Sequence, residues 1–185
     1  MVVQGFEYIL KDGRKALIRS PRDEDAQGVL DFLYLSAGET DNVVRYPEEC
    51  SKYTLEGEKA LFDRINSSEN EAMLVCLVDG KVAGNCHISW NNRIKTRHRA
   101  TVAIVLLREF WNQGIGTRLS LEMIRIAEGN QNILQIELDF VEGNSRARAL
   151  YEKVGFRICG VKPNAIRLKD GTLLNMYSMI REITR

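Results

Sequence analysis

The feature that most constrains the fold is a pair of strand-like runs joined by only two residues. Ala72–Val78 and Lys81–Trp90 flank Asp79-Gly80. An Asp-Gly pair between two such runs is the strongest short-range signal for a β-hairpin, because both residues accept the positive φ of a tight turn. The middle of the chain is therefore predicted to hold an antiparallel strand pair.

A two-residue turn also fixes the register of this hairpin. It sets Cys76 opposite Ala83 and Cys86 opposite Met73, which argues against a disulfide between the two cysteines. No two of the four cysteines have the close spacing of a zinc site, so no metal is expected. Reduced thiols in a cytoplasmic protein are the expectation. Cys159 is expected in the core.

The rest of the chain alternates strand-like and helix-like segments. One helix is expected to start with Ser20 as its cap and Pro21 in the first turn. Further helices are predicted over Leu55–Ile65, Gly114–Glu128 and Asn144–Val154. Strands are predicted over Phe6–Leu10, Lys15–Arg19, Ala100–Leu107, Ile133–Val141, Phe156–Leu168 and Leu173–Ile180.

This order mixes hairpins with helical crossovers, so we expect an α/β (α+β) fold with a mixed sheet, as a single domain over residues 1–185. The net charge of +1 offers no general attraction to nucleic acid or acidic membranes. No apolar run approaches the roughly 18 residues of a membrane span. The N-terminal segment does not resemble a secretory signal.

Two segments could carry chemistry, and the first is a strand that runs through a glycine-containing loop directly into a helix. It reads Ile104 to Leu107, then Trp111-Asn112-Gln113-Gly114-Ile115-Gly116-Thr117. The first turn of a helix presents amide N–H groups without intrahelical partners, and the helix dipole is positive there. The loop is a candidate phosphate cradle, although it matches neither the Walker nor the dinucleotide fingerprint. An ordinary structural turn is the alternative.

The second segment is the helix that begins at Asn144 and ends at Gly155. It places Ala147, Leu150 and Tyr151 on one face. Tyr151 is either a core aromatic residue or a general acid in a cleft. Asn144 is either a helix cap or a ligand contact.

Together the two segments resemble the GCN5-related N-acetyltransferase (GNAT) family. The family's loop pattern is Arg/Gln-x-x-Gly-x-Gly/Ala, and here Trp111 to Gly116 occupy it. The downstream pattern Asn-x-x-Ala-x-x-Leu-Tyr-x-x-x-Gly-Phe is matched from Asn144 to Phe156. The Phe110-Trp111 start resembles the branch that includes ribosomal-protein-alanine N-acetyltransferases.

The resemblance implies a mostly antiparallel central sheet flanked by helices, and an enzyme that moves an acetyl group from acetyl-CoA to a primary amine. It implies that the strand ending at Leu107 splays from its neighbour, that the N–H of Leu106 stabilises the oxyanion, and that Tyr151 protonates the leaving thiolate. The implied acetyl-CoA contacts are Val105, Leu106, Asn112, Gln113, Gly114, Ile115, Gly116, Thr117 and Asn144.

The sequence departs from the family pattern in two places. Trp111 replaces the Arg or Gln of the loop, and the strand position near Thr101 lacks the carboxylate that many relatives carry. The general base therefore stays open. The candidates are His87, His98, a water molecule, or an acidic residue of the segment that holds Glu39, Asp41, Glu48 and Glu49.

The acceptor is expected to be a peptide N-terminus, an amino acid, a polyamine or another small amine, attacking directly in a ternary complex. A non-catalytic acyl-CoA binding or sensing module is the alternative from another class, and a nucleotide-binding protein is a third. The last two predicted strands are candidates for pairing across a two-fold axis, which would form a homodimer.

Overall fold

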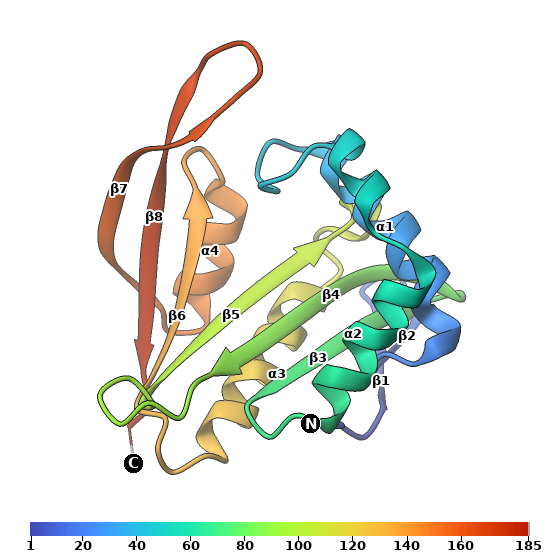
Figure 1. Cartoon of the computed structure of the whole chain (residues 1–185), viewed down its shortest axis with the longest axis horizontal. Helices are drawn as coiled ribbons and strands as arrows, with labels where there is room; N and C mark the ends of the chain where they lie inside the picture. Colours follow the sequence, from blue (N-terminus) through green and yellow to red (C-terminus); the bar gives the residue numbers. More distant parts are fainter. Residues whose placement is uncertain (185) are drawn as a thin grey trace.

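The computed structural model describes residues 1–184, and its centre is one eight-stranded sheet in the order β1-β2-β3-β4-β5-β6-β8-β7 (Figure 1). Every neighbouring pair is antiparallel except β5 and β6. The strands are β1 (Phe6–Ile9), β2 (Lys15–Arg19), β3 (Glu71–Val78), β4 (Lys81–Trp90), β5 (Arg99–Leu106), β6 (Gln135–Val141), β7 (Arg157–Arg167) and β8 (Leu173–Glu182).

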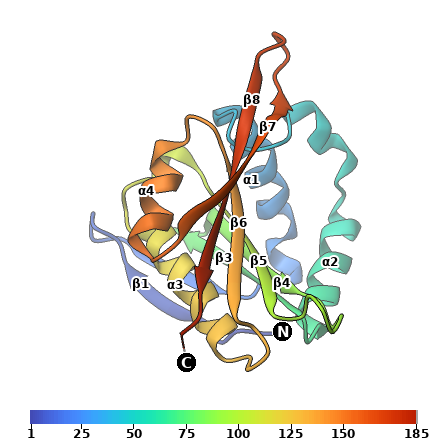
Figure 2. The same cartoon turned by 90° about the vertical axis from the view of Figure 1, so that its left-hand side faces the viewer.

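Helices cover both faces of this sheet. The α-helices are α1 (Ala26–Glu39), α2 (Leu55–Ser67), α3 (Ile115–Glu128) and α4 (Ser145–Lys153). Figure 2 shows α1 and α2 on one side of the sheet and α3 and α4 on the other. The apolar face of α3 that the sequence predicts is buried, including Ile115, Leu119 and Met123. The expected fold class is confirmed. Within residues 1–184, no helix has both the length and the apolar character needed to cross a membrane.

The single parallel pair is short, and its strands then separate. Only Arg99–Thr101 of β5 pairs with β6, where Thr101 lies opposite Glu137. Both strands continue beyond this point, β5 to Leu106 and β6 to Val141. The two strands diverge upwards from their shared end in Figure 1, and this divergence splits the sheet into two halves.

The predicted helix start at Ser20 and Pro21 is wrong. The hydroxyl of Ser20 accepts a hydrogen bond from the N–H of Val3 (2.9 Å), so it fixes the N-terminal segment instead of capping a helix. A 3₁₀ turn over Asp23–Asp25 comes first, and α1 begins only at Ala26. The carboxylate of Asp25 caps that turn because it accepts from the N–H of Arg22 (2.7 Å).

The predicted register of the β3–β4 hairpin is wrong by one residue beyond a bulge. Cys76 lies opposite Gly84, and Cys86 lies opposite Leu74. The shift arises because Ala83 is an extra residue in β4 at the bulge. All four cysteines are free, as expected. Cys159 is exposed and not in the core, because β7 is the edge strand of the sheet.

Candidate functional site

The divergence of β5 from β6 exposes the backbone of β5 on one edge. In an antiparallel pair, successive residues alternate between bonding the neighbour and facing away from it. The N–H of Leu107 donates to the carbonyl of Ala83 (3.0 Å), so Leu106 turns its own N–H and C=O away from β4. Because β6 has already diverged, these groups of Leu106 face the opening between the strands. The same alternation applies to Ile104.

Trp111 satisfies one of these exposed groups. Its indole N–H donates to the carbonyl oxygen of Leu106 (3.1 Å). The guanidinium groups of Arg108 and Arg146 lie 5.5 and 4.7 Å from the Trp111 ring, within the range of cation–π attraction. Trp111 therefore joins the loop to the end of β5 by a hydrogen bond. The carbonyl of Leu106 has a partner, whereas the N–H of Leu106 still faces the opening. The sequence marked Trp111 only as a departure from the family pattern.

Gly84 gives Leu106 the space for this position. A Cβ atom added to Gly84 would lie 2.2 Å from Cδ2 of Leu106 and 2.7 Å from the carbonyl oxygen of Val105. Both separations are far below any real Cβ contact, so only glycine fits without moving β5. No local pattern predicts this requirement, because the close approach depends on the strand register.

The loop after β5 has the backbone shape of an anion cradle. Asn112 and Gly114 both have positive φ (66° and 90°), and Gly114 is the N-cap of α3. The first intrahelical bond runs from the N–H of Arg118 to the carbonyl of Gly114 (3.0 Å), so the N–H groups of Gly114 to Thr117 lie in the unpaired first turn of the helix. The predicted loop residues are thus brought together at one helix N-terminus.

Gly114 is also held at close quarters by β1. A Cβ atom on Gly114 would lie 2.3 Å from the hydroxyl oxygen of Tyr8, in addition to the strain of the left-handed conformation. Next to it, the side-chain oxygen of Gln113 accepts from the N–H of Asp12 (3.2 Å). The β1–β2 hairpin therefore contacts the loop from one side.

Helix α4 contacts the loop from the other side. The side chain of Asn144 accepts from the N–H of Ala147 (3.1 Å), so it caps α4 as expected. Arg146 in the first turn donates to the side-chain oxygen of Asn112 and has no ion pair within residues 1–184. A cation beside unpaired amides adds to the attraction for an anion, and the sequence had not singled out Arg146.

Tyr151 lies where β5 and β6 begin to separate, on the side of α3 and α4. It is 6% exposed, and its ring centroid is 5.8 Å from that of Phe156. Burial raises the pKa of its phenol to about 12, because the charged form loses hydration, and the nearby Cys86 adds to this rise. Only a tight gap with no room for a water molecule lies beside it, and this gap is lined by Val102, Ile104, Ser120, Met123, Ile124, Ile136, Leu138 and Phe156.

The structure separates the candidate bases. His98 lies at the opposite end of β5 from Leu106, roughly 25 Å away at the rise of a strand. His87 lies three residues along β4 from Gly84, roughly 10 Å, with its Nε2 3.1 Å from a carboxylate oxygen of Glu71. A carboxylate oxygen of Glu39 accepts from the N–H of Arg108 (2.7 Å), which places this acid at the end of β5.

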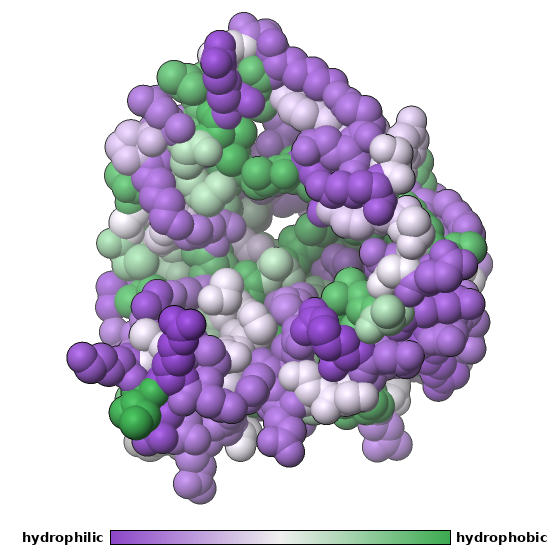
Figure 3. All heavy atoms as spheres, viewed as in Figure 1, coloured by the Kyte–Doolittle hydropathy of each residue, from purple (hydrophilic) through white to green (hydrophobic). Residues whose placement is uncertain are grey.

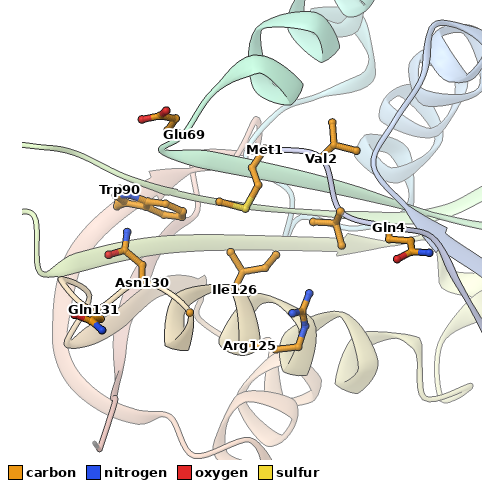
Figure 4. Close-up of a pocket in the computed structure, with 11 residues that line it drawn as sticks. Met1, Val2, Gln4, Glu69, Trp90, Arg125, Ile126, Asn130 and Gln131 are labelled. Atoms are coloured by element: carbon orange, nitrogen blue, oxygen red, sulfur yellow. The ribbon is translucent and has the colours of Figure 1, made fainter.

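A hollow lies between the sheet and the segments above it, bordered in part by hydrophobic residues (Figure 3). A larger cavity, of about 550 Å³, lies elsewhere, between the N-terminal segment and the end of α3 (Figure 4). It contains none of the predicted site residues. Both of its cations are engaged, since Arg125 is paired with Glu122 (2.5 Å) and the ammonium of Met1 donates to the carbonyls of Ser68 (2.6 Å) and Glu71 (3.0 Å). The divergence between β5 and β6 is therefore the candidate site.

The chain is similar to proteins of one known family. Residues 39–156 match the profile of the Acetyltransferase (GNAT) family. An acetyltransferase of the GNAT family from Streptococcus pneumoniae superposes with a TM-score of 0.84 at 28% identity, covering 91% of this chain and 99% of that one.

Two further solved structures share the fold at lower identity. The ribosomal-protein-alanine N-acetyltransferase from Brucella melitensis gives a TM-score of 0.76 at 21% identity, covering 90% of this chain and 99% of the other. A GNAT superfamily phosphinothricin acetyltransferase from Sinorhizobium meliloti, solved in complex with acetyl-CoA, gives 0.76 at 20% identity over 91% and 88%.

The contact between Gly84 and Leu106 yields a first prediction. Gly84→Ala should lower the free energy of unfolding by about 1–3 kcal/mol, since overpacking forces β5 to move. Gly160→Ala is the matched control, because Gly160 is also in a strand and a Cβ there meets nothing within 4 Å. Urea denaturation measures both. Equal stability of the two variants would contradict the close contact.

Proposed function

The chain belongs to the GNAT acetyltransferase family, and we propose that it transfers the acetyl group of acetyl-CoA to a primary amine by direct attack in a ternary complex. The observation that carries the proposal is the divergence of β5 from β6, which leaves the N–H of Leu106 facing the opening between the two strands. Tyr151 packs against the same two strands, beside Ile104 of β5 and Leu138 of β6. Acetyl-CoA is the cosubstrate in this family.

The loop fits the diphosphate of acetyl-CoA. The N–H groups from Asn112 through Thr117 offer donors at the positive end of α3, and Arg146 adds a cation without an ion pair of its own within the described chain. We assign the diphosphate to these amides and to Arg146. The side-chain nitrogen of Asn144 is assigned to the pantetheine, since its oxygen already caps α4.

The end of β5 fits the thioester. The backbone of Val105 and Leu106 borders the opening, and the N–H of Leu106 is the donor that we assign to the oxyanion of the tetrahedral intermediate. Trp111 prevents the carbonyl of Leu106 from repelling that oxyanion, because it is bonded to the indole N–H. The donor therefore faces the opening already fixed in position.

Tyr151 fits the role of general acid. Collapse of the tetrahedral intermediate releases a thiolate that needs a proton. A phenol with a pKa of about 12 stays protonated at every pH at which the protein would work, so the proton is available to the sulfur. A retained phenol in this place favours an enzyme over a module that only binds acyl-CoA.

Deprotonation of the acceptor is assigned to water. A primary ammonium with a pKa near ~10 must lose a proton before it attacks. Thr101 provides no carboxylate, and the carboxylate of Glu39 is bonded to the backbone of Arg108. Asp139, farther along β6, is engaged by Lys162 (2.6 Å) and by Ser178 (2.6 Å). We therefore propose that solvent in the opening accepts the proton. A homodimer and a cytoplasmic location stay predictions.

The loop assignment predicts the effect of Gly114→Ala. The new methyl group is strained at φ +90° and clashes with the hydroxyl of Tyr8. The amides of the loop should therefore shift, and the Kd for acetyl-CoA should rise about tenfold. Isothermal titration calorimetry measures it. Gly171→Ala is the control, because Gly171 has the same φ (+91°) but open space and lies in the β7–β8 turn. A Kd for Gly114→Ala within twofold of that of the control would contradict the assignment of the diphosphate to this loop.

The acid assignment predicts the effect of Tyr151→Phe. Loss of the proton donor should lower kcat about 100-fold while the Kd for acetyl-CoA stays within about twofold. Tyr34→Phe, an exposed tyrosine on α1, should leave kcat unchanged. Release of CoA thiol from acetyl-CoA, measured with a panel of amines, gives kcat.

The raised pKa of Tyr151 also predicts the pH dependence of the wild type. Its kcat should not decline between pH 7 and pH 10, because the phenol loses its proton only near pH 12. An unchanged kcat in Tyr151→Phe would remove this residue from the mechanism.

A further inference from the structure

A second cavity, of about 270 Å³, lies between two segments that are far apart in the sequence. One is the stretch that follows α1, and the other is the end of the β7–β8 hairpin. The volume is slightly below the ~300 Å³ lower limit typical of drug-sized ligand pockets, so it suits a small metabolite. Both segments lie above the diverging strands in Figure 1.

The two segments hold each other on one side of the cavity. The hydroxyl of Tyr46 accepts from the N–H of Lys169 (3.0 Å), and the ammonium of Lys169 lies 4.3 Å from the centre of the Tyr46 ring. Lys169 also forms an ion pair with Glu48. These contacts hold the two segments together beside the cavity.

Two arginines line the cavity, one from each segment, and neither has an ion pair within residues 1–184. They belong to Arg45 and Arg167. Nε of Arg45 is buried without a hydrogen-bond partner. Glu58 is near enough for Arg45 to lower its pKa, but burial of Glu58 has the larger, opposite effect. Two arginines without a carboxylate partner favour an anionic ligand, because an ionised group gains a stronger hydrogen bond from a guanidinium than a neutral acceptor does.

The cavity is adjacent to the proposed reaction centre. Glu39, at the end of α1, accepts from the N–H of Arg108, two residues beyond Leu106. Thr40, the next residue, lines the cavity. The last residue of α1 therefore links the cavity to the end of β5, which suits an acceptor that is anchored in the cavity with its amine directed toward Leu106.

We propose that Arg45 and Arg167 bind the carboxylate of an acceptor that is a free amino acid, an inference that rests on the proposed acetyl transfer and names its substrate class. Asp41 and Glu49 line the same cavity without an ion pair in the described chain, and Glu49 accepts from the N–H of Tyr46, so the lining carries both signs of charge and suits a zwitterion. Val43, Ile166 and Leu168 add apolar lining for a side chain. A peptide N-terminus lacks a carboxylate on its first residue.

The transfer balances with this acceptor. The free α-amine attacks the thioester carbonyl, the N–C bond forms, and the C–S bond breaks. The ammonium first loses one proton to solvent. The departing thiolate then takes a proton from Tyr151. The nitrogen loses a second proton when it becomes an amide, and this proton restores the phenol of Tyr151. The products are an N-acetyl amino acid, CoA thiol and one free proton.

The test compares each L-amino acid with its own carboxamide, by CoA thiol release. The two have nearly the same shape, but only the acid carries the charge. A carboxylate raises the pKa of the neighbouring ammonium, so the amide holds more free amine at neutral pH and reacts faster unless the carboxylate is recognised. We expect kcat/KM for the best amino acid to exceed that of its amide at least tenfold.

The variants Arg45→Gln and Arg167→Gln should each remove most of this preference, raising KM for the acid about tenfold or more with little change for the amide. Arg93→Gln, an exposed arginine in the β4–β5 turn, is the matched control and should retain the preference. Because Arg45 is partly buried, Arg167→Gln keeps the test valid if Arg45→Gln misfolds. Amide and acid acetylated equally well, or a preference untouched in both variants, would overturn the inference and leave the proposed function standing. No thiol release with any amine would overturn both.

Discussion

The rest of the structure depends on the length of the parallel pairing between β5 and β6. Three residues of β5 pair with three residues of β6, and the two strands then separate. Beyond that point β5 keeps its bonds to β4, but its other edge loses a partner. Unpaired backbone groups are costly when they are buried, so such an edge persists only where a ligand or a side chain satisfies them. In this protein the divergence creates the proposed site, and the surrounding elements stabilise it.

Three side-chain features maintain that edge. Trp111 bonds the carbonyl of Leu106, Gly84 leaves room for the side chain of Leu106, and Gly114 lets the following loop turn sharply into α3. Each acts on the same few residues of β5 from a different direction. The loop, the strand end and α4 are packed tightly, since a Cβ atom on Gly116 would lie 3.0 Å from Leu150 and 3.4 Å from Leu106. In the proposed mechanism, the donors are thus fixed before substrate binds, which lowers the cost of stabilising charge in the transition state.

Much of the fold could be predicted because local signals agree with the long-range arrangement. The Asp79-Gly80 turn, the apolar face of α3 and the cap at Asn144 each depend on neighbouring residues only, and the structure has them. Features that depend on contacts between distant segments escaped prediction. The bulge at Ala83 shifts the hairpin register, Ser20 bonds Val3 instead of capping a helix, and the bond from Trp111 to Leu106 requires the strand to have diverged. The pairing of Arg45 with Arg167 in one cavity joins segments that no local pattern connects.

The central claim is that the unpaired edge of β5 binds the thioester carrier through its backbone. Amide hydrogen exchange, followed by NMR with and without acetyl-CoA, tests it most directly, with neighbouring amides as internal references. The account predicts that acetyl-CoA slows exchange at Ile104 and Leu106 at least tenfold, while Ala103 and Val105, which face β4, are protected in both states. Unchanged exchange at Leu106 under saturating acetyl-CoA would contradict it.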